Sequence, residues 1–230
     1  MVNELYTVSY EIGLELNITK TKVMTNTSKT NIMVNNIPLE YVQEYVYLGK
    51  QISFKKTRHR EELNRRINLA WNKFWSNKQV LKSNLNVKLK KKILDSCILP
   101  CLSYASQTWI FNNYTKNKVQ TCQRSMERSI LNLKRKDKKR SVNLRKTTNV
   151  IDALKHCKKL KWQWAGHVAR MPDVKWTKKV TVWAGPNGTR RRGRPMERWM
   201  DEVLKTAGTD WLDRAKDRTT WRQMKEAFTR

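Results

Sequence analysis

Acidic residues are scarce in this chain of 230 residues, where 19 Asp and Glu stand against 49 Lys and Arg and the formal net charge is +30 at pH 7. The chain has no apolar run of about 18 residues, which excludes a transmembrane helix. Its first residues, MVNEL, show neither a basic start nor an apolar stretch, so we expect no secretory signal. These absences predict a strongly basic protein that does not engage a membrane.

Cysteine is sparse too, and Cys97, Cys101, Cys122 and Cys157 are spaced too irregularly for a disulfide framework. Reduced thiols fit the nucleus and cytoplasm, where we expect the protein to reside. Cys157 and His167 have no second close pair beside them, so their spacing is not that of a zinc site. Cys97 and Cys101 lie four apart and fit core packing on one helical face. We therefore expect no metal site.

The positive charge begins abruptly after residue 54. Residues 1–54 hold 4 Lys and 5 acidic residues, a net charge of −1. Residues 55–140 hold 23 basic and 5 acidic residues (+18), and residues 141–230 hold 22 and 9 (+13). Such a long basic body predicts a polyanion as the main partner. The chain's ten Trp and 39% hydrophobic content exclude a disordered basic tail.

The residues before the basic body have the pattern of a small β unit. Residues 4–12 predict the end of a helix that stops at Gly13. Short β-prone runs follow at residues 21–24, 31–34 and 40–48, with turn residues at 35–38. We expect an antiparallel hairpin unit that is too small to be stable alone.

From about residue 58 the apolar period becomes helical. One apolar stripe is formed by Leu63, Ile67, Trp71, Phe74 and Trp75. A second helix should begin near Val87 and bend at Pro100. A third should cover residues 116–133, and the basic run at 134–140 then indicates an exposed linker.

The last ninety residues look like a separate tryptophan-rich region. We expect helices at about 150–165, 195–206 and 218–228, and a strand at 179–183. The predicted fold class is α+β and mostly α. It comprises a small antiparallel β unit at 1–54, a helical region at 55–140 and a basic, Trp-rich helical region at 141–230.

Several short motifs carry a family resemblance through their order. Residues 13–24 read GLELNITKTKVM and residues 47–49 read YLG. Residues 65–75 follow with RRI, AW and FW, and the last region contains WQWAGHVARM at 162–171 and GRP at 193–195. The combination resembles motifs D and E, the thumb and the C-terminal region of reverse transcriptases from non-LTR (LINE-type) retrotransposons. Jockey, RTE and Bov-B elements, whose proteins are called endonuclease–reverse transcriptases, are of this kind. The resemblance covers essentially the whole chain.

The resemblance implies roles for residues of the β unit, which would be a remnant of the polymerase palm. Lys20 matches the lysine of motif D, which would protonate the leaving pyrophosphate or offset its charge. A surface lysine at the start of a strand is the alternative. Tyr47, Leu48 and Gly49 match the primer grip, where glycine lets the backbone approach the primer. An ordinary strand end with a glycine turn is the alternative there.

The resemblance also implies that the thumb and tail contact RNA and DNA, as a template–primer duplex, element RNA or target DNA. The expected contacts are made by Arg65, Arg66, Lys161, Trp162, Trp164, His167, Arg170, Arg190, Arg191, Arg192 and Arg194. Unpaired bases could stack on Trp162, Trp164, Trp176 and Trp183, each worth roughly 1–3 kcal/mol. Residues 190–195 read RRRGRP and contain the core of an AT-hook, which binds the A·T minor groove. General phosphate contact, or a basic loop that caps the next helix, are the alternatives.

The chain departs from the family at the catalytic carboxylates. Nucleotidyl transfer needs two metal ions held by neighbouring carboxylates. The family places them in an Asp-Asp motif ahead of motif D, but this chain has no Asp-Asp pair and its first aspartate is Asp95. Because Mg²⁺ would require the missing palm aspartates, we expect no cofactor in this chain.

We therefore interpret the chain as a truncated RNA-directed DNA polymerase, a fragment of a transposable element that binds nucleic acid without polymerising. A domesticated AT-hook-like DNA-binding module is one alternative reading. A non-functional retroelement relic is another.

Overall fold

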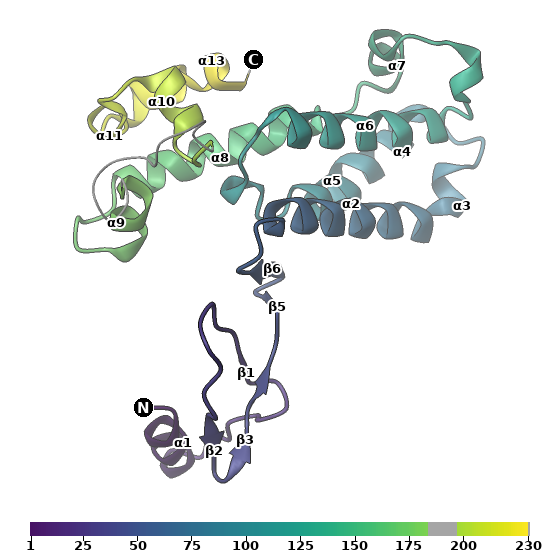
Figure 1. Ribbon diagram of the computed structural model, residues 1–230. Helices are drawn as coiled ribbons and strands as arrows, with labels where there is room; N and C mark the ends of the chain where they lie inside the picture. Colours follow the sequence, from purple (N-terminus) through teal and green to yellow (C-terminus); the bar gives the residue numbers. More distant parts are fainter. Residues whose placement is uncertain (184–196, 230) are drawn as a thin grey trace. The chain divides into compact units, whose positions relative to one another are not determined.

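The computed structural model of the protein describes residues 1–183 and 197–229, and the chain divides into two units, Met1–Glu62 and Leu63–Arg230. Helices dominate and the strands are short (Figure 1), which confirms the predicted α+β, mostly α class. The regions expected at 55–140 and 141–230 share the second unit, and their separation as domains stays a prediction. None of the helices in the described part of the chain combines the length and apolar character needed to cross a bilayer.

The first unit begins with α1 (Val2–Glu11), which ends just before Gly13 as predicted. Gly13 has a φ of +75°, a left-handed conformation that suits glycine after a helix. None of the residues of α1 is buried. The helix therefore contributes little to a core within this unit.

The strands of the first unit form three separate pairs. They are β1 (Lys22–Val23) with β4 (Glu40–Tyr41), β2 (Met33–Val34) with β3 (Ile37–Pro38), and β5 (Glu44–Tyr47) with β6 (Lys50–Ser53). The last two pairs are antiparallel, as predicted, but β1 and β4 are parallel. The strand expected at 40–48 is divided at residues 42–43, because residues 40–41 pair with β1 whereas residues 44–47 pair with β6.

The two hairpin turns are tight. Asn35 and Asn36 join β2 to β3 with φ values of +49° and +60°. Leu48 and Gly49 join β5 to β6 with φ values of +45° and +76°. Two successive positive φ values are typical of the type I′ turn that matches strand twist. Leucine adopts this conformation at a steric cost, so Leu48 is an unusual residue for its place.

The second unit is helical. Its elements in order are α2 (Arg58–Ser76), which begins within the first unit, α3 (Lys78–Leu81), α4 (Val87–Ile93), the π-helix η1 (Leu94–Ile98), α5 (Leu99–Ser103), the 3-10 turn η2 (Ser106–Thr108), α6 (Asn113–Ile130), the 3-10 turn η3 (Arg135–Asp137), α7 (Ser141–Thr148), α8 (Ala153–Ala169), α9 (Trp176–Val182), α10 (Asp201–Ala207), α11 (Trp211–Arg214), α12 (Arg218–Gln223) and α13 (Lys225–Thr229).

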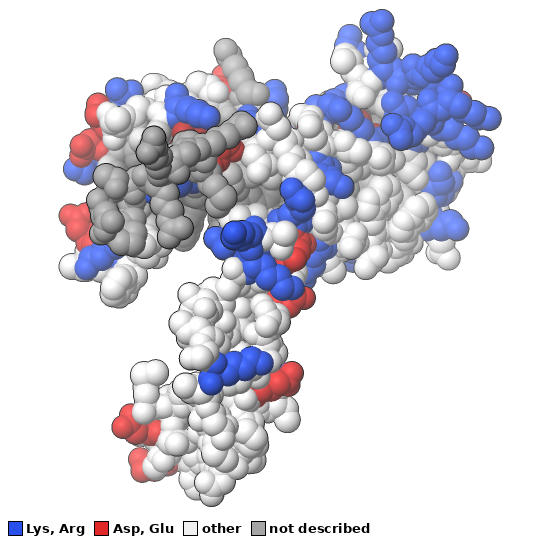
Figure 2. Space-filling view, viewed as in Figure 1, with Lys and Arg blue, Asp and Glu red and all other residues white. Residues whose placement is uncertain are grey.

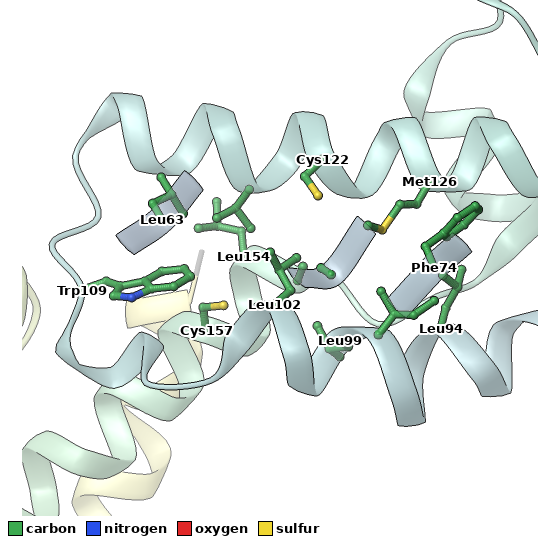
Figure 3. Packing of buried hydrophobic residues seen from close by; sticks show 14 of the residues in the cluster. Leu63, Phe74, Leu94, Leu99, Leu102, Trp109, Cys122, Met126, Leu154 and Cys157 are labelled. Atoms are coloured by element: carbon green, nitrogen blue, oxygen red, sulfur yellow. The ribbon is translucent and has the colours of Figure 1, made fainter. Parts of the chain in front are cut away.

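A first hydrophobic core lies between α2, α5, α6 and the start of α8. Figure 3 shows its labelled side chains pointing toward one another, among them Phe74, Leu102, Met126 and Leu154. Cys122 and Cys157 also lie in this core, and burial raises the pKa of both thiols to about 12. Such thiols stay protonated and inert, in agreement with a packing role.

A second core joins the remainder of α8 to the short helices α10 to α13. Trp162 and Trp221 stack with ring centroids 3.9 Å apart and planes only 6° from parallel. The indole N–H of Trp162 donates to the carbonyl of Trp221 over 2.8 Å, and that of Trp221 donates to the carbonyl of Trp162 over 3.0 Å. Helix α8 therefore contributes to both cores and links them.

One sequence prediction in this unit needs correction and another stays a prediction. The helix begins at Val87 as expected and changes to π geometry over η1 before Pro100, and the bend expected at Pro100 stays a prediction. The strand expected at 179–183 is instead helix α9. The N–H groups of Lys178 and Lys179 donate to the carbonyl of Lys175, and these bonds start a helical turn despite the β-branched residues that follow.

Candidate nucleic-acid interface

Lys20 lies at the surface of the first unit, in a turn that precedes β1. The side-chain oxygen of Asn17 accepts its backbone N–H over 3.0 Å. The hydroxyl of Tyr45 donates to the carbonyl of Lys20 over 3.2 Å, which ties this turn to β5. Lys20 and the strand leading to the primer-grip match are thus directly connected within the first unit.

The primer-grip match forms the exposed turn between β5 and β6. Tyr47 and Leu48 have 58% and 75% of their surface exposed, and Gly49 is exposed as well. A protruding turn with two left-handed residues presents backbone groups that a sugar–phosphate chain can approach. The primer-grip role of this turn stays a prediction.

The two arginines expected on the thumb differ in exposure. Arg66 of α2 is only 6% exposed, and its guanidinium lies over the ring of Tyr104, 4.4 Å from the centroid. Arg65 is half-buried. Arg66 therefore packs within the helical unit and does not form the surface contact that we expected, because its planar cation stacks favourably on an aromatic face.

Lys161 and Trp162 also lie in the interior, contrary to their expected place at the surface. Trp162 is 1% exposed and forms the stack with Trp221. Lys161 is fully buried, and its ammonium donates to the carbonyl of Trp109 and to the carboxylate of Glu202. The ammonium also lies 5.2 Å from the ring centroid of Trp199. Burial lowers the pKa of Lys161, while Glu202 opposes that shift.

The other expected residues of α8 remain nearer the surface. His167 is exposed, Trp164 is half-buried, and their ring centroids are 5.4 Å apart. Arg170 follows the helix, and its guanidinium donates to the carbonyl of Ala215 over 2.6 Å, which holds α11 in place. Trp176 and Trp183 expose most of their rings, so they keep the potential for stacking that Trp162 lacks.

The arginines of the AT-hook match, Arg190, Arg191, Arg192 and Arg194, lie outside the described residues. Within residues 1–183 and 197–229, no three His, Cys, Asp or Glu side chains gather into a group that could hold a metal ion. Asp95 accepts the backbone N–H of Ile151 over 3.0 Å and pairs with Lys91 at 2.6 Å. This first aspartate of the chain is thus part of the helical framework.

The structure reveals a basic surface that the sequence motifs did not single out. Figure 2 shows Lys and Arg gathered over the segment that joins α6 to α7. The residues there are Lys134, Arg135, Lys136, Lys138, Lys139 and Arg140, all exposed, and Asp137 is the single acid among them. Beside them, Lys82, Arg128, Lys134 and Arg135 line an open groove at the end of α6. The basic run was visible in the sequence as a linker, but Lys82 joins it only through the fold.

Comparisons with known proteins support an origin in a mobile element. No family model and no solved structure matches the chain. The chain is 34% identical over 241 residues to a transposon-derived protein of Caenorhabditis elegans, and the match covers 96% of this chain and 86% of that protein. The chain therefore belongs to the family of that transposon-derived protein.

Proposed function

We propose that the chain is the palm edge, thumb and C-terminal nucleic-acid-binding region of a reverse transcriptase from a non-LTR retrotransposon. In this role it holds a template–primer duplex, element RNA or target DNA. The transposon-derived relative supports the origin of the chain in a transposable element. The order of residues 13–24, 47–49 and 162–171 supports the more specific assignment to a reverse transcriptase.

The observation that carries the binding proposal is the unneutralised positive charge of the helical part. Residues 55–140 hold 23 basic and 5 acidic residues, and two of those acids, Glu62 and Glu127, are buried. Between α6 and α7 the cations gather on one exposed surface (Figure 2). A surface of this kind attracts the phosphates of nucleic acid and releases their counterions on binding.

We further propose that this chain alone does not polymerise nucleotides. Two-metal chemistry needs carboxylates that converge on one site. Three carboxylates of the helical part have structural roles: Asp95 accepts the backbone N–H of Ile151 before α8, Asp152 caps α8, and Glu127 lies buried against Thr148. Primer extension with Mg²⁺ and all four deoxynucleotides should give no product, whereas incorporation above the background of a heat-treated control would overturn this part.

A competition assay separates the reverse-transcriptase assignment from the AT-hook alternative. The labelled ligand is an RNA template annealed to a DNA primer, and the competitors are the same hybrid without label and an A·T-rich DNA duplex of equal length. We expect the hybrid to compete at least as well as the duplex. Preference for the A·T duplex that disappears with Arg192→Ala and Arg194→Ala would contradict the assignment and favour the AT-hook module.

A further inference from the structure

A groove with a basic lining lies where α6 ends and the chain turns toward η3. Its cations come from three places in the sequence: Lys82 follows α3, Arg128 belongs to the last turn of α6, and Lys134 and Arg135 follow that helix. Ser125 and Ser129 add hydroxyl groups. Among the described residues that line the groove, none is acidic. The groove is thus a cluster of hydrogen-bond donors with a strong positive charge.

Two lysines hold the groove in shape by binding the end of α6. The ammonium of Lys82 donates to the carbonyl of Ser129 and to the side-chain oxygen of Asn132, both over 2.6 Å. The buried ammonium of Lys90 donates to the carbonyl of Ser83 over 2.6 Å and lies 3.4 Å from that of Ile130. Cations at this position donate hydrogen bonds to the last carbonyls of the helix, which have no partner within it. They also interact favourably with the partial negative charge at the helix C-terminus. Lys82 and Lys90 are therefore positioning residues.

The remaining polar side chains of the groove lie on α6 and on the segment that follows it. Ser125, Arg128 and Ser129 occupy positions i, i+3 and i+4 of α6 and share one face of the helix. One terminal nitrogen of Arg128 donates to the carbonyl of Lys139 over 2.9 Å, while the other is buried and has no hydrogen-bond partner among the described residues. Lys134 and Arg135 are exposed, and the one nearby acid, Asp137, accepts the backbone N–H of Lys134 over 2.7 Å.

We propose that this groove binds the phosphate backbone of nucleic acid, with Arg128, Lys134 and Arg135 as the contacting cations. The inference rests on the proposed function and names the surface that performs it. Guanidinium and hydroxyl groups side by side are the donors that phosphate oxygens prefer in protein–nucleic acid complexes.

The surroundings of the groove favour a chain of phosphates over a single anion or a base. Lys136, Lys138, Lys139 and Arg140 continue the positive surface beyond the groove (Figure 2). Among the described lining residues there is no aromatic ring on which a base could stack. Contacts of this kind do not read sequence and depend steeply on salt.

The test compares two triple variants of the full chain by fluorescence anisotropy with labelled 20-mers, as single-stranded DNA and as an RNA–DNA hybrid. The groove variant carries Arg128→Gln, Lys134→Gln and Arg135→Gln. The matched control carries Arg222→Gln, Lys205→Gln and Lys225→Gln. These changes also remove three positive charges, but from α10, α12 and α13. At about 0.1 M salt the groove variant should bind roughly 10- to 100-fold more weakly, and its log–log salt slope should fall by about 2–3. The control should stay within about threefold of the wild type.

A third variant separates loss of charge from loss of folding, because it changes the same three side chains without changing their charge. Arg128→Lys, Lys134→Arg and Arg135→Lys keep every charge and should keep the salt slope. On the wild-type chain, bound 20-mer should also protect Lys134 from acetylation while Lys205 stays reactive.

The possible failures are distinguishable. Equal binding by the groove and control variants, or no protection of Lys134, would overturn the groove proposal alone. Competition by polyglutamate as strong as that of the 20-mer, at equal charge concentration, would overturn it in favour of an acidic protein partner. Failure of the wild-type chain to bind any of the nucleic acids would overturn the proposed function as well.

Discussion

At the scale of single residues, the tryptophan stack on α8 explains why a glycine lies in the last turn of that helix. A Cβ atom added to Gly166 would lie 2.5 Å from the indole nitrogen of Trp221, far inside van der Waals contact. That ring is held by its stack on Trp162 and by two reciprocal hydrogen bonds, so it has little room to move. Glycine at this position lets α12 approach α8 closely enough to close the second core.

The variant Gly166→Ala should therefore destabilise the protein. Although alanine favours a helix, the clash with Trp221 should outweigh that gain and cost about 1–3 kcal/mol in the free energy of unfolding. Thermal melting followed by circular dichroism measures the effect. Gln163→Ala, on the exposed face of the same helix, is the control and should melt like the wild type. If Gly166→Ala melted at the wild-type temperature, Trp221 would have to move aside without loss of stability, which would contradict the prediction.

The buried carboxyl of Glu127 predicts a dependence of stability on pH. Burial raises its pKa, against the opposing effects of Arg145 and a hydrogen bond from Thr148, while Asp152 raises it further and Arg124 lowers it. The folded state therefore holds this proton more tightly than the unfolded state. The stabilising contribution is complete below the unfolded pKa of about 4.5 and is lost as the pH rises through the folded value.

Glu127→Gln should remove this dependence. At pH 7 the variant should be more stable than the wild type by on the order of 1 kcal/mol, since it no longer buries a charge. The difference should shrink as the pH falls toward 5. Chemical denaturation at both values checks the prediction, and an equal or lower stability of the variant at pH 7 would show that attraction to Arg145 outweighs burial.

At the scale of elements, the first unit contrasts with the helical one. Its buried apolar side chains are Val34 and Leu39, whereas α1 has none and the turn at Leu48 is exposed. A unit that buries so little apolar surface is opened easily by thermal fluctuation. The same unit carries Lys20 and the primer-grip match, so the expected polymerase remnants belong to the less stable part of the chain.

Hydrogen exchange on the full chain tests this contrast directly. The amides of α1 and of β5–β6 should exchange at least about 100-fold faster than those in the middle of α6 and α8, because the latter open only with the core. Helix α9, which also lacks buried residues, serves as an internal reference for fast exchange. Protection of α1 equal to that of α6 would mean that the first unit is stabilised by contacts beyond its small core.

Sequence periodicity predicted the long helices and was wrong for the short helix α9. Helices α2, α6 and α8 repeat apolar residues over four or five turns, so their pattern is clear. Helix α9 spans seven residues, and its Val180, Thr181 and Val182 favour a strand locally. The turn of hydrogen bonds to Lys175 and the ion pair between Lys178 and Asp173, at 2.7 Å, hold it as a helix instead.

Contacts between residues distant in the sequence explain what could not be predicted about the candidate site. The resemblance implied a nucleic-acid contact for Lys161, although the structure buries this lysine, a residue type that is rarely buried. Its partner Glu202 lies 41 residues away, and only the fold brings the two together. In the same way Lys82 joins Asn132 across 50 residues to shape the basic groove. The positive run at 134–140 was readable from the sequence, but the groove beside it was not.

At the scale of the whole molecule, the positive charge of the chain and its transposon-derived family both support binding to nucleic acid. A member of a transposon-derived family carries a net charge of +30, and all of its net positive charge lies after residue 54. We expect the chain to keep the nucleic-acid grip of a retroelement enzyme without its catalytic carboxylates. In this account affinity comes mainly from phosphates and the counterions that they release.

The dependence of binding on salt tests that central claim most directly. The affinity of the full chain for a primed RNA–DNA hybrid would be measured by fluorescence anisotropy between about 50 and 300 mM NaCl, a range in which counterion release dominates. If about six phosphates are contacted, the plot of log affinity against log salt should be linear with a slope near −4 to −5. A flat plot, or no binding at the lowest salt, would contradict the account.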